Sequence, residues 1–445
     1  MDKDVLHQGV LFALQKPEYV ANPYPLYHRL RSETPFYWDF VSCGWFLTRY
    51  TDVRSALADL RLTTKNFPFD ASQFPPTLQN RLAPFLSVMN KGVLHNAASE
   101  HDRLRRPLNR AFNPACFERL RPEMEALTQE LLGKAERRGS MDVVSDYSGP
   151  LADYMIGELL GLPHANRAEF IKWCDRLRNF TMERRMGRET VLRAKSAVKS
   201  FEAVRAYVRK LISVRQENFS DDVIGHSFAV EANEAPLTED EVLANCVFFL
   251  HAGARNMAAS ITNAVLGLLR HPEQFARLRE DPQSITIAVE ELLRYETPIQ
   301  VSIRGVPEEI EFAGRRVGPK QLLVMLLGAA NRDPQQFADP DRLDLTRRPN
   351  RHVSFGVGPH GCVGGWMARF GLAIAIGAIL HRQTSFRLTP RKLQWNPPLM
   401  RRTVRTLPVL LDRGLRNSQR SQPHMARTRS PRPTRVAQTL VPSLR

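Results

Sequence analysis

One cysteine of this chain stands where a metal ligand could form. Residues 355–365 read Phe-Gly-Val-Gly-Pro-His-Gly-Cys-Val-Gly-Gly, and an apolar helix is predicted from Trp366 onward. Three glycines within six residues allow a tight loop whose backbone can approach a flat ligand closely. The loop delivers Cys362 just before a helix N-terminus, where the macrodipole and free N–H groups favour the thiolate. A bound metal would complete the deprotonation, so this segment predicts a thiolate ligand to a metal.

The elements that must position this cysteine are mainly helical. Apolar residues recur at helical spacing in long segments, and shorter segments are typical of strands. Prolines and glycines are dense between residues 298 and 359, which predicts a long ordered coil before the cysteine loop. We therefore expect a mainly α fold with small β-sheets. The expected helices are 117–137, 151–162, 191–215, 239–269, 285–295 and 363–381, and the expected strands are 45–48, 310–312 and 322–325.

Composition limits the class of protein. The chain has 445 residues, 24% of them charged, which is enough for a large folded core. Its five cysteines are widely spaced and form no CxxC pair, so they indicate a reducing compartment rather than a disulfide framework. The apolar runs are too short or too interrupted by polar residues for a membrane span. We expect a cytoplasmic protein without an integral membrane segment.

The charge is unevenly distributed. The formal net charge is +17, and eight arginines without any acidic residue lie in residues 413–445, which leaves +9 for residues 1–412. The last segment is also rich in Ser, Pro and Gln, so we interpret it as a basic, disordered tail. Such a tail could touch nucleic acid or membrane, but a solvated appendage is the simpler interpretation and no nucleic-acid partner is expected. The basic folded part suits an acidic electron carrier.

The cysteine segment resembles the haem-binding signature of the cytochrome P450 family. The matching positions are Phe355, Gly356, Gly358, His360, Cys362 and Gly364, with Ala368-Arg369 four residues on. Segments near the N-terminus, at 22–27 and 45–54, are also similar to the family, so the resemblance covers about residues 20 to 412. It implies a single P450 domain over residues 1–412 that holds haem b, with Cys362 as the axial ligand of iron. A thiolate at that position pushes electron density that favours O–O cleavage.

The resemblance also implies a set of cofactor contacts. His101 and Arg105 match the stretch of the family in which a histidine and an arginine four residues later reach a haem propionate. Arg304, His352 and His360 look like the other propionate contacts, and Phe355 and Gly356 belong to the loop beneath the haem. Arginine–carboxylate pairs would give this contact its geometric specificity.

Glu291 and Arg294 resemble the ExxR pair of the family. Alone, a Glu and an Arg at i, i+3 form only an ordinary helical pair. In the family this pair binds an arginine of the coil before the cysteine loop, for which Arg342, Arg347 and Arg348 are candidates. The expected role is folding and haem retention.

The long helix 239–269 should cross the distal face of the haem, and there the sequence departs from the family. Most members carry Ala-Gly, then an acid, then a threonine that orders water for proton delivery. Here the segment reads Ala252-Gly253-Ala254-Arg255-Asn256. Gly253 still permits the local widening where dioxygen sits. An arginine cannot act as a general acid near neutral pH, and an amide is a poor proton relay.

Three hypotheses follow for the chemistry. In the first, a monooxygenase uses Asn256, ordered water or a substrate group as the relay. In the second, a peroxygenase uses hydrogen peroxide while Arg255 holds a substrate carboxylate. In the third, Arg255 points away into an ion pair and the enzyme performs atypical chemistry. A non-catalytic haem gas sensor is the alternative from a different class.

The substrate pocket implied by the resemblance is apolar. Phenylalanines gather in the loop before residue 98 and on the distal helix, at Phe67, Phe69, Phe74, Phe85 and Phe249. They predict a hydrophobic small-molecule substrate, preferably a terpenoid, with weak similarity to P450s of gibberellin-type diterpene pathways. We expect dioxygen as the oxidant and electrons from a ferredoxin with its reductase.

Overall fold

Helices account for most of the structure, and short strands gather in three small sheets. The computed structural model describes residues 9–64, 72, 74–96, 98–182, 188–229, 235–396 and 401–412. The predicted tail, residues 413–445, lies outside the described residues. Among those described, no helix combines the length and the apolar character that crossing a membrane requires.

The helices begin and end where the sequence provides caps. Helix α14, for example, starts with a capping box in which Thr238 and Glu241 bond to each other's backbone N–H. The α-helices are α2 Val10–Ala13, α3 Pro17–Ala21, α4 Tyr24–Glu33, α5 Tyr50–Ala58, α6 Pro76–Met89, α7 Ala98–Ala111, α8 Pro114–Arg119, α9 Arg121–Arg138, α10 Gly149–Leu159, α11 His164–Met182, α12 Arg188–Glu217, α13 Val223–Phe228, α14 Glu239–Phe249, α15 Arg255–Arg270, α16 Pro272–Glu280, α17 Ile285–Tyr295, α18 Leu327–Ala330 and α19 Gly365–Leu380.

The largest sheet has the strand order β1-β2-β7-β4. Strands β1 and β2 form an antiparallel hairpin, β2 pairs in parallel with β7, and β7 pairs antiparallel with β4. A second sheet has the order β3-β9-β8, and β5 pairs with β6. The strands are β1 Phe36–Asp39, β2 Gly44–Leu47, β3 Ser140–Asp142, β4 Val301–Gly305, β5 Ile310–Phe312, β6 Arg315–Val317, β7 Leu322–Leu326, β8 Ser385–Leu388 and β9 Pro408–Asp412.

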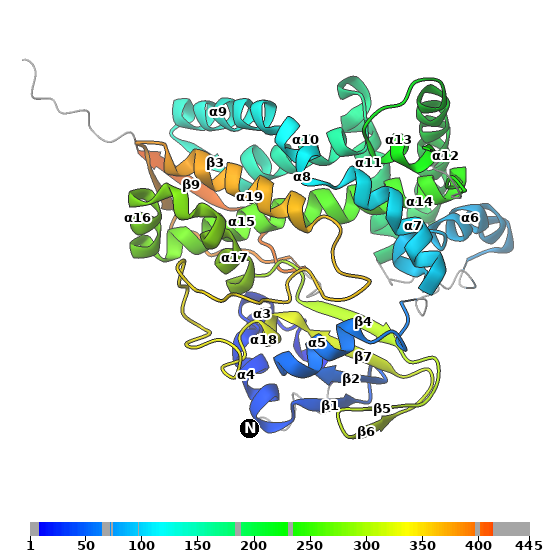
Figure 1. Ribbon diagram of the computed structural model, residues 1–445, viewed down its shortest axis with the longest axis horizontal. Coiled ribbons are helices and arrows are strands. Elements are labelled where there is room, and N and C mark those ends of the chain that lie inside the picture. The colour runs from blue at the N-terminus through cyan, green and yellow to red at the C-terminus, as the bar shows by residue number, and fades with distance from the viewer. Residues whose placement is uncertain are drawn as a thin grey trace, which may run out of the picture.

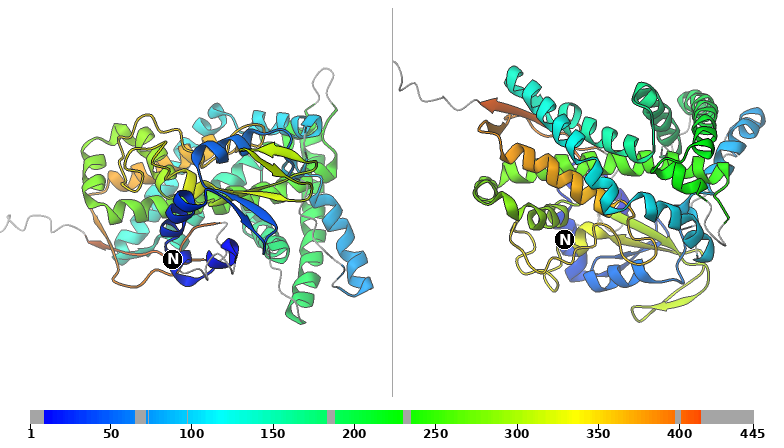
Figure 2. Two further views of the ribbon diagram at one scale, coloured as in Figure 1. Left: turned by 90° about the horizontal axis from the view of Figure 1, so that it is seen from below. Right: turned by 45° about the horizontal axis from the view of Figure 1, so that its top comes forward.

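The molecule has a helical part and a part built around the large sheet. Figure 1 shows α9, α10, α15 and α19 in the upper half, and the large sheet with α4 and α5 in the lower half. The largest apolar core lies among the helices, and two smaller apolar clusters lie on the large sheet. The coil between α18 and α19 runs between the two parts, and Figure 2 shows the same division after rotation.

The predicted fold class is confirmed, and two expected helices are broken. The expected helix 117–137 is divided at Leu120 between α8 and α9. The expected helix 285–295 matches α17, and the expected strand 310–312 matches β5. The expected helix 239–269 is divided into α14 and α15 by a π-helical segment, Leu250–Ala254. Apolar periodicity cannot reveal the one-residue insertion that makes a π-turn, and such turns are frequent at functional sites.

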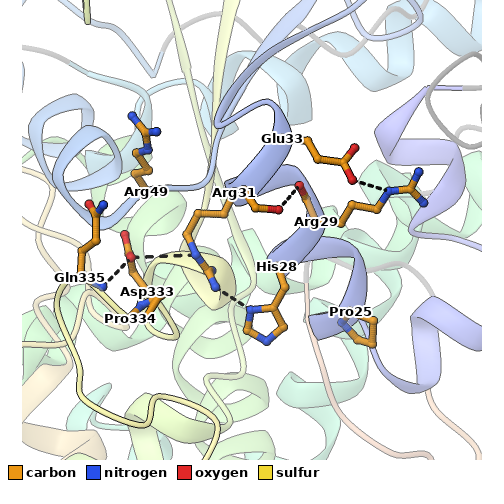
Figure 3. A pocket seen from close by; sticks show the side chains of 10 residues that line it. Pro25, His28, Arg29, Arg31, Glu33, Arg49, Asp333, Pro334 and Gln335 are labelled. Atoms are coloured by element: carbon orange, nitrogen blue, oxygen red, sulfur yellow. Dashed lines mark hydrogen bonds and ion pairs between the residues drawn. The ribbon is translucent and has the colours of Figure 1, made fainter. Parts of the chain in front are cut away.

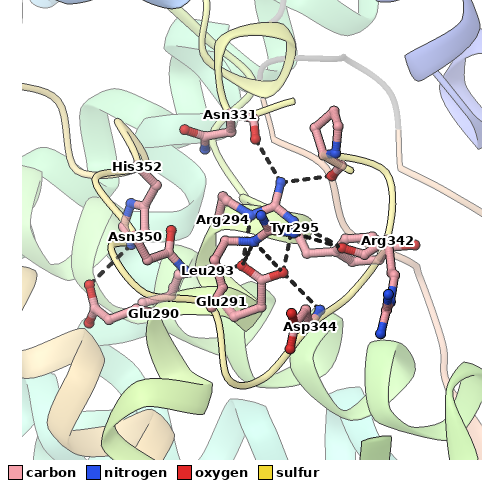
Figure 4. A network of polar contacts seen from close by, with 12 residues as sticks. Glu290, Glu291, Leu293, Arg294, Tyr295, Asn331, Arg342, Asp344, Asn350 and His352 are labelled. Carbon is pink, nitrogen blue, oxygen red and sulfur yellow. Dashed lines mark hydrogen bonds and ion pairs between the residues drawn. The ribbon is translucent and has the colours of Figure 1, made fainter. Parts of the chain in front are cut away.

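A buried carboxylate holds the coil before the cysteine loop in place (Figure 4). Glu291 accepts hydrogen bonds from Arg294 at 2.7 and 2.8 Å and from the Arg347 Nε at 3.1 and 3.2 Å. The Asn350 amide and the backbone N–H of Asp344 also donate to it, at 3.0 and 2.9 Å. Of the three arginines that the sequence left open, Arg347 is therefore the one that pairs with Glu291.

Arg294 completes the same network. Both Glu291 and Arg294 have no solvent-exposed side-chain surface. Arg294 donates to the backbone carbonyls of Asn331 and Pro340 at 2.8 Å each, and to that of Arg342 at 3.3 Å. One helical pair thus satisfies backbone carbonyl groups of a coil whose own backbone hydrogen bonds are confined to short turns.

Replacing Glu291 with alanine should lower the free energy of unfolding by about 3–5 kcal/mol, because two buried arginines would lose their carboxylate. Urea titration followed by circular dichroism measures the change. The matched control is Glu118→Ala, which removes an i, i+3 partner from an exposed arginine, Arg121. That change should cost less than about 1 kcal/mol, and equal losses in both variants would contradict the assigned role of Glu291.

Candidate cofactor and substrate site

The cysteine loop is closed by backbone hydrogen bonds. The Cys362 N–H donates to the Phe355 carbonyl at 2.8 Å, and the Gly361 N–H donates to Gly358 at 2.9 Å. Gly356 and Gly358 have φ angles of +68° and +77°, a region that residues with a Cβ rarely adopt. A Cβ at Gly358 would also lie 2.9 Å from Ala58 of α5. The glycines are therefore required by both turn geometry and close packing.

The loop presents the Cys362 sulfur on an accessible face. The residue is exposed, yet protein surrounds the thiol closely enough for burial to raise its pKa. The Gly364 N–H and the charges of Arg105 and Arg369 act in the opposite direction but do not cancel the rise. An exposed residue whose thiol is closely surrounded by protein is expected at the bottom of a concave site. The helix terminus alone therefore does not produce the thiolate that the sequence led us to expect, and coordination to a metal would.

Four basic side chains gather beside the loop, and we call them the cation cluster: His101, Arg105, Arg304 and His360. The rings of His101 and His360 are 4.3 Å apart between centroids, and the Arg105 guanidinium donates to the Pro359 carbonyl at 3.1 Å. Burial, followed by the charges of His101, Arg304 and Arg105, lowers the pKa of His360 to about 4. Helix α7, strand β4 and the cysteine loop thus bring their cationic groups to one place.

Apart from Asp102, which lies 3.4 Å from His101 Nδ1, no carboxylate among the described residues lies at ion-pair distance from the cation cluster. Arg304 is 8% exposed and donates only to Ser302 and to the Ile303 carbonyl, at 3.1 and 3.0 Å. Within the described ranges, neither Arg304 nor Arg105 has a carboxylate at ion-pair distance, and burial lowers the pKa of both guanidinium groups. An unpaired buried cation is costly. A dianionic ligand lying on Cys362 would remove that cost, so the residues present fit haem with its two propionates.

His352 does not join the cation cluster. Its Nε2 lies 3.2 Å from the Glu290 carboxylate, which also accepts two hydrogen bonds from Arg369 at 2.6 and 2.9 Å. Burial raises the pKa of Glu290, but His352 and Arg369 outweigh it and bring the pKa to about 2. The propionate contact expected of His352 stays a prediction, and the structure adds that the ring lies against an acid on α17 that the motif does not contain.

The distal segment places Gly253 and Arg255 in different surroundings. A Cβ at Gly253 would lie 2.6 Å from Ile156 and 3.5 Å from Met367, so a larger residue there would require the Ile156 side chain to shift. The Arg255 guanidinium donates to both oxygens of Asp175 on α11, at 2.5 and 3.3 Å, and lies 3.8 Å from Asp153. This agrees with the ion-pair half of the third hypothesis, and it does not support Arg255 as the ligand of a substrate carboxylate.

Asn256 meets an arginine that sequence reasoning missed. The Arg401 Nε–H donates to Asn256 Oδ1 at 2.8 Å, and Arg401 Nη2 lies 3.3 Å from His251 Nε2. Arg401 is one of two adjacent arginines near the C-terminal strands, and its neighbour Arg402 pairs with Glu296. Sequence offered no signal to separate the two, since the partner residues lie more than a hundred positions away.

The phenylalanines of the predicted pocket are partly core residues. Phe74 and Phe85 lie 5.8 and 6.3 Å from Phe180 of α11, and Phe85 also lies 5.4 Å from Phe201 of α12, between ring centroids. Phe249 packs on Phe112, which follows α7, at 5.3 Å between ring centroids. Phe67 and Phe69 lie outside the described residues. These contacts join α6 to the helix pair α11–α12 through aromatic packing.

A separate polar cavity of about 750 Å³ opens beside α4 (Figure 3). The Arg31 guanidinium forms part of its wall and is held by His28, Asp333 and the Ala329 carbonyl. None of the lining residues belongs to the cysteine loop, the cation cluster or the distal segment, so this cavity is not the cofactor site. It is lined by Pro25, His28, Arg29, Arg31, Ser32, Glu33, Arg49, Asp333, Pro334 and Gln335.

Comparisons with known proteins agree with this geometry. The family model described as Cytochrome P450 matches residues 74–410. The biotin biosynthesis cytochrome P450 of Bacillus subtilis is 34% identical over 401 residues, which cover 89% of this chain and 98% of that protein. The 6-deoxyerythronolide B hydroxylase of Saccharopolyspora erythraea is 31% identical over 381 residues, 83% and 90% of the two chains.

Solved structures give the same result. P450BioI, solved in complex with an acyl carrier protein bearing hexadec-9Z-enoic acid, has a TM-score of 0.78 at 32% identity, covering 89% of this chain and 100% of that chain. A myxobacterial P450, CYP267B1, solved in complex with myristic acid, has a TM-score of 0.77 at 33% identity, covering 90% and 99%.

Replacing Arg304 with glutamine should weaken haem retention, because one buried cation would no longer face the propionates. We expect the apparent dissociation constant for haem to rise about 10- to 100-fold, the range for hydrogen bonds to charged groups. Titration of haem into the apoprotein, followed by absorbance, measures it. Arg316→Gln, on the exposed face of β6, serves as the control, and equal affinities of the two variants would refute the contact.

Proposed function

The chain belongs to the cytochrome P450 family of haem b monooxygenases, and on that premise we propose that it hydroxylates a hydrophobic small molecule. The oxidant is dioxygen, and the electrons come from a ferredoxin with its reductase. The observation that carries the proposal is the closed glycine loop that presents Cys362 beside four clustered basic side chains, of which Arg105 and Arg304 have no carboxylate at ion-pair distance among the described residues. Its relatives are named monooxygenases and hydroxylases, so the gas-sensor alternative is not retained.

When bound through Cys362, haem b supplies the iron chemistry that activates dioxygen. The protein residues then have three tasks. His101, Arg105, Arg304 and His360 would hold the propionates. Gly253 keeps the distal segment free of a side chain where α10 and α19 approach it. Asn256 would order water through its Nδ2 hydrogens, because its Oδ1 accepts from Arg401.

Proton supply is the step at which this chain differs from the family pattern. The distal segment carries Arg255 where an acid is usual, and the acids stand on the neighbouring helices instead, at Asp153 and Asp175. Burial raises the pKa of Asp153, while the charge of Arg255 opposes the rise. We propose that these carboxyl groups, together with Arg255, form the polar route from solvent to the distal side.

A terpenoid is the substrate that we favour, with a gibberellin-type diterpene as the narrower hypothesis. Support comes from the aromatic packing around α6, α11 and α12, which suits a bulky apolar skeleton. Similar proteins are named for biotin biosynthesis, polyketide biosynthesis and the hydroxylation of 6-deoxyerythronolide B. For the electron donor, the net charge of +9 on residues 1–412 favours an acidic carrier.

Replacing Cys362 with alanine should abolish the thiolate-type band of the reduced carbon monoxide difference spectrum and product formation together, because no other described residue can provide the sulfur ligand at that place. The control is Cys43→Ser, which alters the other exposed cysteine and should leave both signals intact.

The oxidant is tested in the same assay. Product should form with NADPH, reductase and ferredoxin, and hydrogen peroxide alone should give less than about a tenth of that rate. A higher rate with peroxide alone would overturn the proposed use of dioxygen and electrons. A variant Cys362→Ala that kept its spectrum would overturn the proposed ligand.

A further inference from the structure

One buried hydroxyl group near the cofactor site has no hydrogen-bond partner in the chain. Thr64 is 6% exposed, and its Oγ1 makes no hydrogen bond to the described residues. A buried hydroxyl without a partner costs free energy, and such groups are uncommon in native proteins. The hydroxyl of Thr64 therefore indicates an acceptor that the chain itself does not supply.

The backbone places Thr64 next to Arg304. Thr63 forms an antiparallel bridge with Gly305, and their backbones exchange two hydrogen bonds at 3.0 and 2.8 Å. One residue further along each chain, the same register brings Thr64 opposite Arg304 of β4. Residues that lie opposite each other in an antiparallel pair project from the same face, with Cβ atoms about 4.5–5.5 Å apart.

The Arg304 side chain on that face belongs to the cation cluster. Its charge contributes to the lowered pKa of His360, so the guanidinium lies close to the cysteine loop. Among the described residues, only its Nη1 is hydrogen-bonded, to the Ser302 hydroxyl and to the Ile303 carbonyl. The Nε and Nη2 donors of Arg304 are therefore left for a ligand.

A hydroxyl and a guanidinium on one face form a donor set for a carboxylate. A guanidinium can only donate, a hydroxyl can donate or accept, and an ionised carboxylate can only accept, through two oxygens. Rotation about χ1 of Thr64 exchanges the positions of its hydroxyl and methyl groups, so the hydroxyl can turn to an acceptor beside Arg304. A propionate of haem b supplies such an acceptor.

We propose that Thr64 donates a hydrogen bond to the haem propionate that Arg304 binds, and that this bond slows the loss of haem from the protein. The inference rests on the haem assignment and adds a neutral donor to the four basic side chains of the cation cluster. Sequence motifs do not identify this position, because its role depends on how the chain around Thr63 pairs with the end of β4.

Replacing Thr64 with valine keeps the volume of the side chain and removes its hydroxyl. We expect haem to leave the haem-loaded protein about 10-fold faster, because a hydrogen bond to a charged group is lost. Transfer of haem to excess apomyoglobin, followed by absorbance, measures the rate. Thr64→Ser retains the hydroxyl and should stay within about twofold of the wild type.

A spectroscopic measurement distinguishes this hydrogen bond from a purely structural role. The propionate bending band in the resonance Raman spectrum responds to hydrogen bonds that the carboxylate accepts. It should move to lower frequency in Thr64→Val and stay in place in Thr64→Ser. The matched control is Thr48→Val, since Thr48 is also buried but donates to the Pro35 carbonyl at 3.1 Å. That change should lower the urea midpoint and leave the band unmoved.

The outcomes separate this inference from the proposed function. Unchanged haem loss in Thr64→Val would overturn the proposed bond, and so would faster loss without a shift of the band. Wild-type haem affinity in Arg304→Gln would overturn the inference together with its premise. The carbon monoxide spectrum reports on Cys362 instead, so a failure of the haem-thiolate assignment would be recognised there and not in the variants of Thr64.

Discussion

The rest of the structure depends on the hydrogen bonds that the Glu291 carboxylate accepts. It lies without solvent contact on α17 and accepts hydrogen bonds from two arginines, one asparagine and one backbone amide. The coil between α18 and α19 has no strand or long helix among its described residues, so side-chain contacts order it, and Glu291 and Arg294 supply the largest connected group of them. Because the cysteine loop follows directly on that coil, the position of the Cys362 sulfur depends on a carboxylate that makes its hydrogen bonds outside the loop.

The same structure leaves electrostatic strain that a cofactor would relieve. Two arginines and two histidines are gathered in a partly dehydrated place, and the pKa shifts of Arg105, Arg304 and His360 all record the cost to their charged forms. A folded chain tolerates such a cluster when an anion neutralises it. Folding and cofactor binding are therefore linked, because the cost of burying the Arg105 and Arg304 guanidinium groups would be offset when the propionates bind.

Local sequence patterns predicted much of this structure, but they did not predict contacts between residues that are far apart in the sequence. The glycine loop, α17 and β5 follow from residue types at fixed spacing, since turns and amphipathic faces are encoded within a few residues. The choice of Arg347 over Arg342 or Arg348 depends on how the coil folds back onto α17. The surroundings of His352 depend on Glu290, which lies 62 positions away in the sequence. Those of Arg401 depend on Asn256, which lies 145 positions away. A helical pattern also cannot show where a π-turn interrupts it.

The π-turn at Leu250–Ala254 has a consequence for how the distal helix can change over evolutionary time. An extra residue in one turn rotates everything that follows by about 100° around the helix axis. Deleting one residue there would rotate every side chain of α15 about the helix axis. The contacts of Arg255 with Asp175 and of Asn256 with Arg401 would then be lost together. Substitutions can change these contacts one at a time, whereas an insertion or deletion in this turn would change which side chains of α15 face the distal side.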